Sequence, residues 1–144
     1  ASLLFMKEIA SLTHVVEITD DPNFVRTKLP DNFKVLKIRG PLFFAAADRI
    51  VGELCKQVPG LDGLIIHMKY SAYLDAGGHS EIEKLMTLCE KNQTSIRFSA
   101  WQFQPLKTLA KARGETAGPL GVSFSTLDEA IDDALIGGES REAR

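Results

Sequence analysis

Short apolar runs alternate with amphipathic stretches along most of this chain, and that alternation limits the fold more than any other feature of the sequence. The segment Leu64–Met68 is apolar apart from His67 and follows a glycine, as expected for a strand covered on both faces. Strands are predicted at 15–18, 33–39, 64–68, 95–101 and 122–124. Helices are predicted at 45–57, 79–91, 105–114 and 127–137. Strands joined through helices run parallel, so the pattern predicts an α/β domain with a mostly parallel sheet.

The helix signals are clearest in the first and the last of these segments. Apolar residues recur at helical spacing in the first, at Ala47, Ile50, Val51, Leu54, Cys55 and Val58. The last helix opens with Thr126 followed three residues later by Glu129, which is a capping-box pattern. We expect Gly137-Gly138 to end that helix and the remaining residues to form a polar tail.

Composition excludes several classes of protein. The chain has 144 residues, enough for one domain, and a formal net charge of -2, which gives no attraction to nucleic acid. No apolar run approaches the roughly 20 residues that span a bilayer. Cys55 and Cys89 fall on apolar helix stripes, so we expect reduced thiols. The histidines share no metal-ligand spacing, and no familiar nucleotide-binding or catalytic motif occurs, so neither a metal nor a cofactor is expected and the chain is not expected to be an enzyme.

Two segments at strand-to-helix junctions are candidate binding sites. The first is Leu74–Gly78 with His79, where Asp75 precedes Ala76, Gly77 and Gly78. A helix starting behind the glycines offers free N–H groups and a positive dipole end, although a capping aspartate with a glycine turn explains the same residues. The second is Gly40–Phe44, where Phe43 or Phe44 would anchor a partner if exposed and belongs to the core otherwise.

The start of the chain, Ala1–Leu12, is unusually apolar, beginning Ala-Ser-Leu-Leu-Phe-Met. It fits either a short helix packed on the domain or the end of a membrane helix whose apolar part lies upstream.

The chain resembles the STAS domain, the fold shared by sulfate transporters and anti-sigma factor antagonists, and most closely the cytoplasmic C-terminal domain of bacterial SulP-family anion transporters. The matching stretches are Ala1–Met6, Gly40–Ala47, Leu74–Gly78 and Phe103–Leu106. The resemblance implies a small, mostly parallel mixed sheet of about five strands, with about four or five helices packed mainly on one side. It also implies a tether at 1–13, the STAS domain at 14–137 and a polar tail at 138–144.

The implied function is regulation of a secondary anion transporter that carries sulfate, bicarbonate or a dicarboxylate. The domain would act at the cytoplasmic face of the inner membrane, as part of a multi-pass membrane protein. Its partners would be the transporter's own transmembrane domain and a cytosolic regulatory protein, and it would form oligomers through the parent transporter. The residues carried over to the partner- or anion-binding site are Asp75, Ala76, Gly77, Gly78, His79, Phe43 and Phe44.

One departure from the family pattern separates its two branches. Soluble anti-sigma factor antagonists carry Asp-Ser-Ser/Thr-Gly in this loop and are phosphorylated on the second hydroxyl residue. The corresponding positions here are Ala76 and Gly77, which cannot accept a phosphate. This favours the transporter branch. Two alternatives remain. One is a free-standing anti-sigma factor antagonist. The other is a small enzyme or ligand-binding domain that uses Asp75 and the helix start at Gly77-Gly78, with weak nucleotide binding favoured over catalysis.

Overall fold

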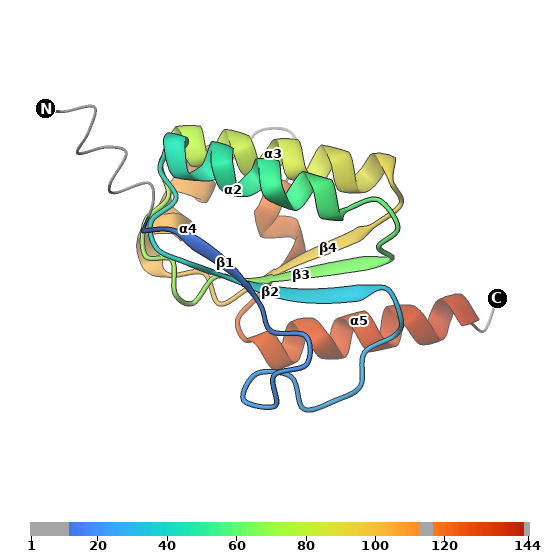
Figure 1. The fold of residues 1–144 in the computed structure, drawn as a ribbon. Helices are drawn as coiled ribbons and strands as arrows, with labels where there is room; N and C mark the ends of the chain where they lie inside the picture. Colours follow the sequence, from blue (N-terminus) through green and yellow to red (C-terminus); the bar gives the residue numbers. More distant parts are fainter. Residues whose placement is uncertain (1–11, 113–116, 143–144) are drawn as a thin grey trace, which may run out of the picture.

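A five-stranded sheet lies at the centre of the molecule, between helices on its two faces (Figure 1). The computed structural model describes residues 12–112 and 117–142, with 138–142 as backbone alone. The strands are β1 (His14–Glu17), β2 (Phe33–Arg39), β3 (Gly63–His67), β4 (Ser95–Ser99) and β5 (Ser123–Phe124), paired in that order. β1 is antiparallel to β2 and the other pairs are parallel, which confirms the predicted mixed sheet.

The described helices lie mostly on one face of this sheet, as predicted. They are α2 (Phe44–Gln57), α3 (Ala76–Lys91), α4 (Phe103–Lys111), the 3₁₀ helix η1 (Gly118–Val122) and α5 (Leu127–Glu142). α2 and α3 run side by side over one face, and α5 covers the opposite face (Figure 1). None of the helices in the described ranges combines the length and the apolar character needed to cross a bilayer.

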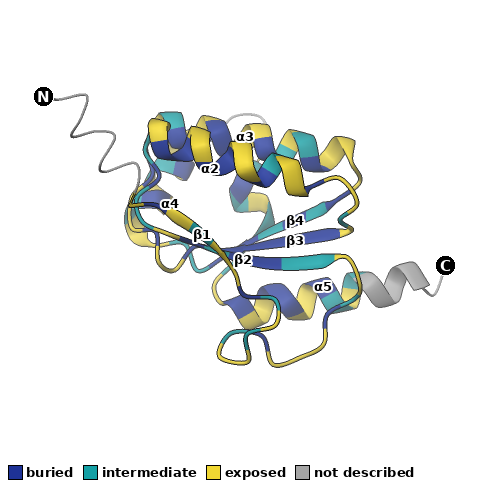
Figure 2. Ribbon diagram, viewed as in Figure 1, coloured by how far each residue is buried: buried dark blue, intermediate teal, exposed yellow. Residues whose placement is uncertain are grey.

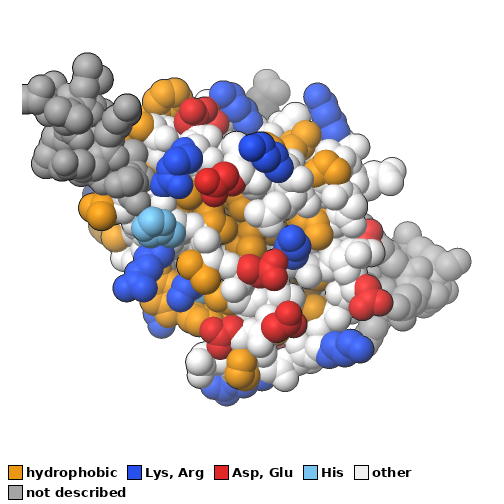
Figure 3. Space-filling model, viewed as in Figure 1, with side chains coloured by type: hydrophobic (Ala, Val, Ile, Leu, Met, Phe, Trp, Pro, Cys, Tyr) orange, Lys and Arg blue, Asp and Glu red, His pale blue; other side chains and the backbone are white. Residues whose placement is uncertain are grey.

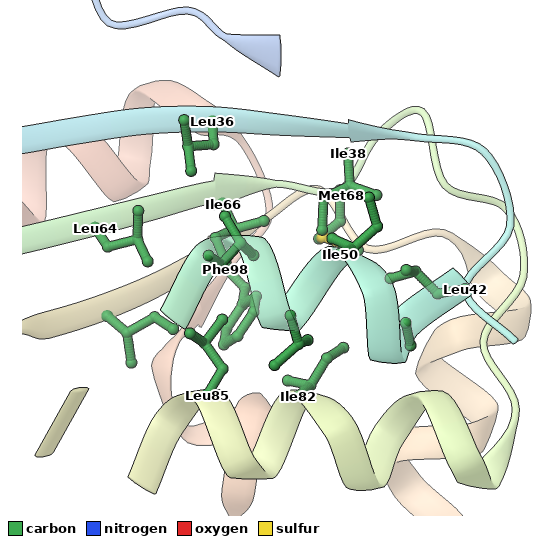
Figure 4. Close-up of a cluster of buried hydrophobic side chains, with 14 of the residues drawn as sticks. Leu36, Ile38, Leu42, Ile50, Leu64, Ile66, Met68, Ile82, Leu85 and Phe98 are labelled. Carbon is green, nitrogen blue, oxygen red and sulfur yellow. The ribbon is translucent and has the colours of Figure 1, made fainter. Parts of the chain in front are cut away.

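The core divides between the two faces because successive side chains of a strand point to opposite sides. In β3, Leu64 and Ile66 belong to the cluster beneath α2 and α3, whereas Ile65 packs towards α5. Figure 4 shows the larger cluster, in which strand side chains meet Ile82 and Leu85 of α3. Each fully buried Leu or Ile contributes roughly 1.5–3 kcal/mol. The outer sides of α2 and α3 are exposed (Figure 2), so each helix buries one stripe.

The structure corrects two predicted helix boundaries. α3 begins at Ala76 rather than His79, so the predicted loop glycines, Gly77 and Gly78, lie in its first turn. α5 does not end at Gly137-Gly138 but continues to Glu142. A glycine lowers helix stability by about 1 kcal/mol and does not forbid the helix. A Cβ on Gly137 would lie 3.3 Å from a guanidinium nitrogen of Arg97, so the missing side chain leaves room for that group.

Smaller differences concern the C-terminal third. α4 starts at Phe103, with Pro105 in its first turn as predicted, and ends at Lys111 instead of Gly114, which lies outside the described residues. The last strand begins at Ser123 because η1 occupies the preceding residues. The predicted cap of α5 is confirmed, since Thr126 Oγ1 accepts the Glu129 N–H at 3.2 Å. Most of the expected tether also lies outside the described residues; Thr13 is buried and donates to the Pro41 carbonyl at 2.6 Å.

Candidate functional site

The two predicted site segments lie side by side at the carboxyl ends of β2 and β3. Their pairing continues beyond the strands through a parallel bridge between Leu42 and Leu74. Leu42 N–H donates to the Tyr73 carbonyl at 2.8 Å, and Gly40 N–H donates to the Tyr70 carbonyl at 3.1 Å. This continued pairing places the start of α2 directly against the start of α3.

Asp75 joins the two helix starts. Its Oδ1 accepts the Gly78 N–H at 2.7 Å, which is an N-cap bond within α3. Its Oδ2 lies 3.4 Å from the Phe44 nitrogen and accepts that N–H at the start of α2. Phe43, the N-cap residue of α2, supplies no side-chain cap of its own. One carboxylate therefore satisfies N–H groups of two helices and carries negative charge at both positive dipole ends.

The two glycines are required by this close approach of α3 to the loop before α2. A Cβ on Gly78 would lie 2.2 Å from the Leu42 carbonyl oxygen, which is backbone and has little freedom to move. A Cβ on Gly77 would lie 2.8 Å from Cβ of Phe44. The missing side chains of Gly77 and Gly78 thus let the start of α3 approach the chain's own Leu42 and Phe44.

The remaining predicted site residues differ sharply in accessibility. Phe44 is 57 % exposed, and Ala76 beside it is also exposed, whereas Phe43 is half-buried. His79 is buried, and its Nε2 lies 3.2 Å from a carboxylate oxygen of Glu83 one turn along α3. Phe44 and Ala76 are thus available to a partner, and the His79 ring is held within the domain.

The structure shows that α4 also contacts this site, which the sequence did not predict. Gln104 receives the Leu74 N–H on Oε1 at 2.7 Å and donates from Nε2 to the Leu74 carbonyl at 3.0 Å. This amide pairs with the backbone as a neighbouring strand would, and it fixes the loop before α3. The stretch Phe103–Leu106 carried the family resemblance, but nothing in its spacing indicated a contact with Leu74.

α4 also brings exposed aromatic area to the same end of the sheet. Phe103 is 74 % exposed and Tyr73 is 44 % exposed. We call Phe44, Tyr73, Ala76 and Phe103 the helix-start surface, because all four lie at or just before the first turns of α2, α3 and α4. Isolated apolar residues are common on protein surfaces, but three aromatic side chains at one end of a small domain are typical of a contact surface.

The polar groups at this site serve the backbone. The hydroxyl of Ser71 is buried and donates to the Gly40 carbonyl at 2.7 Å. Asp75 is committed to two N–H groups, and no nucleophile and base are paired among these site residues. Within the described part of the chain, no cluster of His, Cys, Asp and Glu could hold a metal ion. The arrangement can present a rigid contact surface.

The fold and this surface define a small α/β domain whose exposed aromatic residues gather where its helices begin. The chain belongs to the STAS domain family, whose model matches residues 24–130. The match includes both helix-start segments and ends within α5.

Solved structures share the fold. A sulfate transporter family protein from Wolinella succinogenes is 24 % identical with a TM-score of 0.70, covering 83 % of this chain and 99 % of that one. The STAS domain of a SulP transporter from Vibrio cholerae is 22 % identical with a TM-score of 0.64, covering 78 % and 88 %. The murine anion transporter Slc26a9 is 15 % identical with a TM-score of 0.72, and the match covers 94 % of this chain but 24 % of the transporter.

A search of curated proteins gave no match. Domains of this fold thus occur in SulP and SLC26 transporters, and also in anti-sigma factor antagonists such as SpoIIAA.

Proposed function

We propose that this chain is the regulatory STAS domain of a SulP-family secondary anion transporter, and that its helix-start surface docks against the transporter's membrane domain. It would act at the cytoplasmic face of the inner membrane, in a protein that carries sulfate, bicarbonate or a dicarboxylate. The observation that carries the proposal is Phe44, which is 57 % exposed while Asp75 accepts its backbone N–H at the start of α2.

The rigidity of Phe44 favours docking. Ordering a side chain and its loop on binding costs free energy, and a backbone already held by hydrogen bonds has less freedom to lose. Buried aromatic anchors contribute most of the binding energy at typical protein interfaces. Phe44 combines an apolar ring in solvent with a backbone N–H held by Asp75. A rigid contact of this kind would pass movement of the domain directly to whatever it touches.

The charges favour an apolar contact over an acidic partner. The carboxylate of Asp75 already occupies the position that an anion would take at the starts of α2 and α3. Over the outer side of α2, Figure 3 shows acidic and basic side chains interspersed. We therefore propose that apolar area, rather than charge, provides the contact.

A soluble anti-sigma factor antagonist is the second candidate, because proteins of that kind share the fold. The family pattern implies a phosphorylated hydroxyl in the first turn of α3. Ala76 and Gly77 stand there, and neither side chain has a hydroxyl. This chain would need another way to be switched, so the transporter reading is the better supported of the two.

The first test is the reading frame upstream of residue 1. The proposal expects several apolar segments of about 20 residues each, the length that spans a bilayer. A start codon directly before residue 1, with no such segments, would reject the transporter assignment and leave a free-standing STAS protein.

The second test uses the full-length transporter and a photo-crosslinking amino acid at position 44. Ile136 is the matched control, because it is 64 % exposed but lies on α5, on the opposite face of the sheet. We expect crosslinks from position 44 to membrane-domain peptides and none from position 136. Phe44→Asp should change the initial uptake of labelled sulfate, bicarbonate or succinate, and Ile136→Asp should not. If position 44 crosslinks exclusively to a separate cytosolic protein, that protein and not the membrane domain is the partner of this surface.

A further inference from the structure

A second polar cluster lies on the other face of the sheet, away from the helix-start surface. Lys37, His67 and Ser99 are partners in the register of β2, β3 and β4, so they form one row across the sheet. Two residues earlier on each strand, the corresponding row is Val35, Ile65 and Arg97. α5 packs over that earlier row, and Arg97 donates to Asp133 of α5 at 2.8 Å.

α5 begins at Leu127 and leaves the row of Lys37, His67 and Ser99 beside a hollow of about 470 Å³. Phe24, His67, Lys69, Tyr70, Trp101 and the start of α5 line this hollow, which we call the α5 hollow. Its volume lies within the range of small-molecule sites.

His67 presents one unpaired ring nitrogen to the α5 hollow. The residue is 5 % exposed, and its Nδ1 lies 2.8 Å from the buried Ser99 hydroxyl oxygen. Among the described residues nothing pairs with Nε2. Every fully buried side-chain nitrogen or oxygen in the described ranges has a hydrogen-bond partner, so Nε2 must reach the open side of the ring. That side is the α5 hollow, which His67 lines.

The Ser99 hydroxyl fixes which nitrogen carries the proton. Within the described structure that hydroxyl has Nδ1 of His67 as its hydrogen-bond partner. A buried hydroxyl that donates to nothing costs free energy, so its O–H donates to Nδ1. The neutral imidazole then carries its proton on Nε2. The α5 hollow thus contains a fixed N–H donor aimed at its interior.

Charges of both signs surround the α5 hollow and nearly balance. Lys69 lines it, and Lys37 lies beside it with Nζ 4.8 Å from the centre of the Phe24 ring and 5.1 Å from that of Tyr70. Asp128 supplies one negative charge at the rim. Asp21, whose Oδ1 accepts the N–H of the lining residue Asn23 at 2.9 Å, lies close by, so two ammonium groups face two carboxylates, and the start of α5 adds its positive dipole end. This balance suits a monoanion better than a dianion.

The walls of the α5 hollow are aromatic. Phe24 and Tyr70 meet the His67 ring edge to face, with ring centres 6.1 Å and 5.8 Å apart. Trp101 also borders the hollow, but its ring packs against Phe98 with ring centres 5.3 Å apart, and its indole N–H donates to the Ser123 hydroxyl at 2.8 Å. Fixed aromatic walls favour a planar apolar body over a hydrated inorganic ion.

We propose that the α5 hollow binds a small monoanion consisting of a carboxylate on a planar apolar group. The carboxylate accepts the Nε2–H of His67 and pairs with Lys69, and the apolar group lies against Phe24 and Tyr70. This ligand site is separate from the helix-start surface and does not depend on the proposed docking function.

The test is a titration of the folded chain with benzoate, followed by ¹H–¹⁵N NMR. Trp101 borders both the α5 hollow and a second hollow beside Leu106 and Ser123, so the amides of Lys69 and Tyr70, which line the α5 hollow, are the reporters. We expect saturable shifts of these two amides and of the amides of residues 126–128. Benzyl alcohol, which keeps the ring without the charge, and inorganic phosphate, which keeps charge without the ring, should each bind at least about tenfold more weakly.

Three surface variants should change the affinity for benzoate in different ways. Lys69→Ala should weaken benzoate binding by about fivefold, because it removes an exposed ammonium partner. Asp128→Asn should tighten it by about twofold, because it removes the opposing charge at the rim. Lys91→Ala, at the far end of α3, should leave it unchanged. Equal binding of benzyl alcohol or phosphate, an absence of saturable shifts, or identical affinities in all three variants would overturn the proposal.

Discussion

The carboxylate of Asp75 accepts the Phe44 N–H across two helices, at 3.4 Å, while it caps its own helix through Gly78 at 2.7 Å. The starts of α2 and α3 are therefore joined by one side chain. This relationship holds the backbone of Phe44 while its side chain is exposed, which is the basis of the proposed docking surface.

Removing the Asp75 carboxylate should destabilise both helix starts. We expect Asp75→Ala to lower the free energy of unfolding by about 2 kcal/mol, at the upper end for a single N-cap. Asp75→Asn should cost about half of that, because an amide has one acceptor oxygen and Asp75 uses both of its oxygens. Urea denaturation measures the two differences. Asp132→Ala, at an exposed position of α5, is the control; an equal loss there would argue against the double cap.

The glycines provide a pair of substitutions with opposite expected signs. Gly78→Ala should destabilise the fold by about 3 kcal/mol, since its Cβ would lie 2.2 Å from the Leu42 carbonyl oxygen. Gly52 lies inside α2, and a Cβ added there would have no neighbouring atom within 4 Å. Gly52→Ala should therefore stabilise the fold by about 1 kcal/mol. Thermal denaturation of the two variants measures both changes in stability. A neutral Gly78→Ala would mean that α3 can move away from the loop before α2.

The packing of Gly77 and Gly78 shows which features of the fold could not be predicted from the sequence. The alternation of apolar runs predicted the strands and the helices because it depends on burial, which acts at every turn of an element. The sequence predicts the start of α3 three residues too late, at His79, because Gly77 and Gly78 resemble a turn. Their packing partners, Leu42 and Phe44, belong to a different loop, and a contact so distant in sequence has no local pattern.

The same reason explains the contacts that the sequence did not indicate. Lys37, His67 and Ser99 are unremarkable members of three separate strands, and the strand register makes them neighbours. Gln104 pairs with Leu74 across the gap between α4 and the loop before α3. Family resemblance located Asp75 and the phenylalanines, but it could not tell that Phe44 is exposed while His79 is buried.

The two cysteines should differ in reactivity. Both are free thiols, as predicted, with Cys89 buried and Cys55 half-buried. Burial, with a smaller contribution from Cys55, raises the pKa of Cys89 to about 11. Almost no thiolate is present there at pH 8, and the thiolate is the reactive form. In the native chain we expect a disulfide reagent to modify Cys55 slowly and Cys89 not at all, and to modify both in urea. Rapid reaction of two thiols in the native state would contradict this burial.

His67 should make the fold less stable in mild acid. Burial lowers the pKa of His67, and the nearby charges of Lys69 and Lys37 lower it further. In the unfolded chain histidine has a pKa of about 6.5. Between the folded pKa and about 6.5, the unfolded chain therefore binds more protons, and stability rises with pH. As pH falls through this range, the free energy of unfolding should decrease.

The measurement is urea denaturation at a series of pH values for the native sequence and for His67→Phe. The phenylalanine keeps an aromatic ring against Phe24 and Tyr70 but cannot take up a proton. Its overall stability will fall because Ser99 loses its acceptor, so the informative quantity is the slope with pH. The variant should lose the part of the slope below about pH 6.5 that belongs to His67. Identical slopes, or an NMR titration of His67 at or above the ordinary histidine value, would show that its ring is not buried as described.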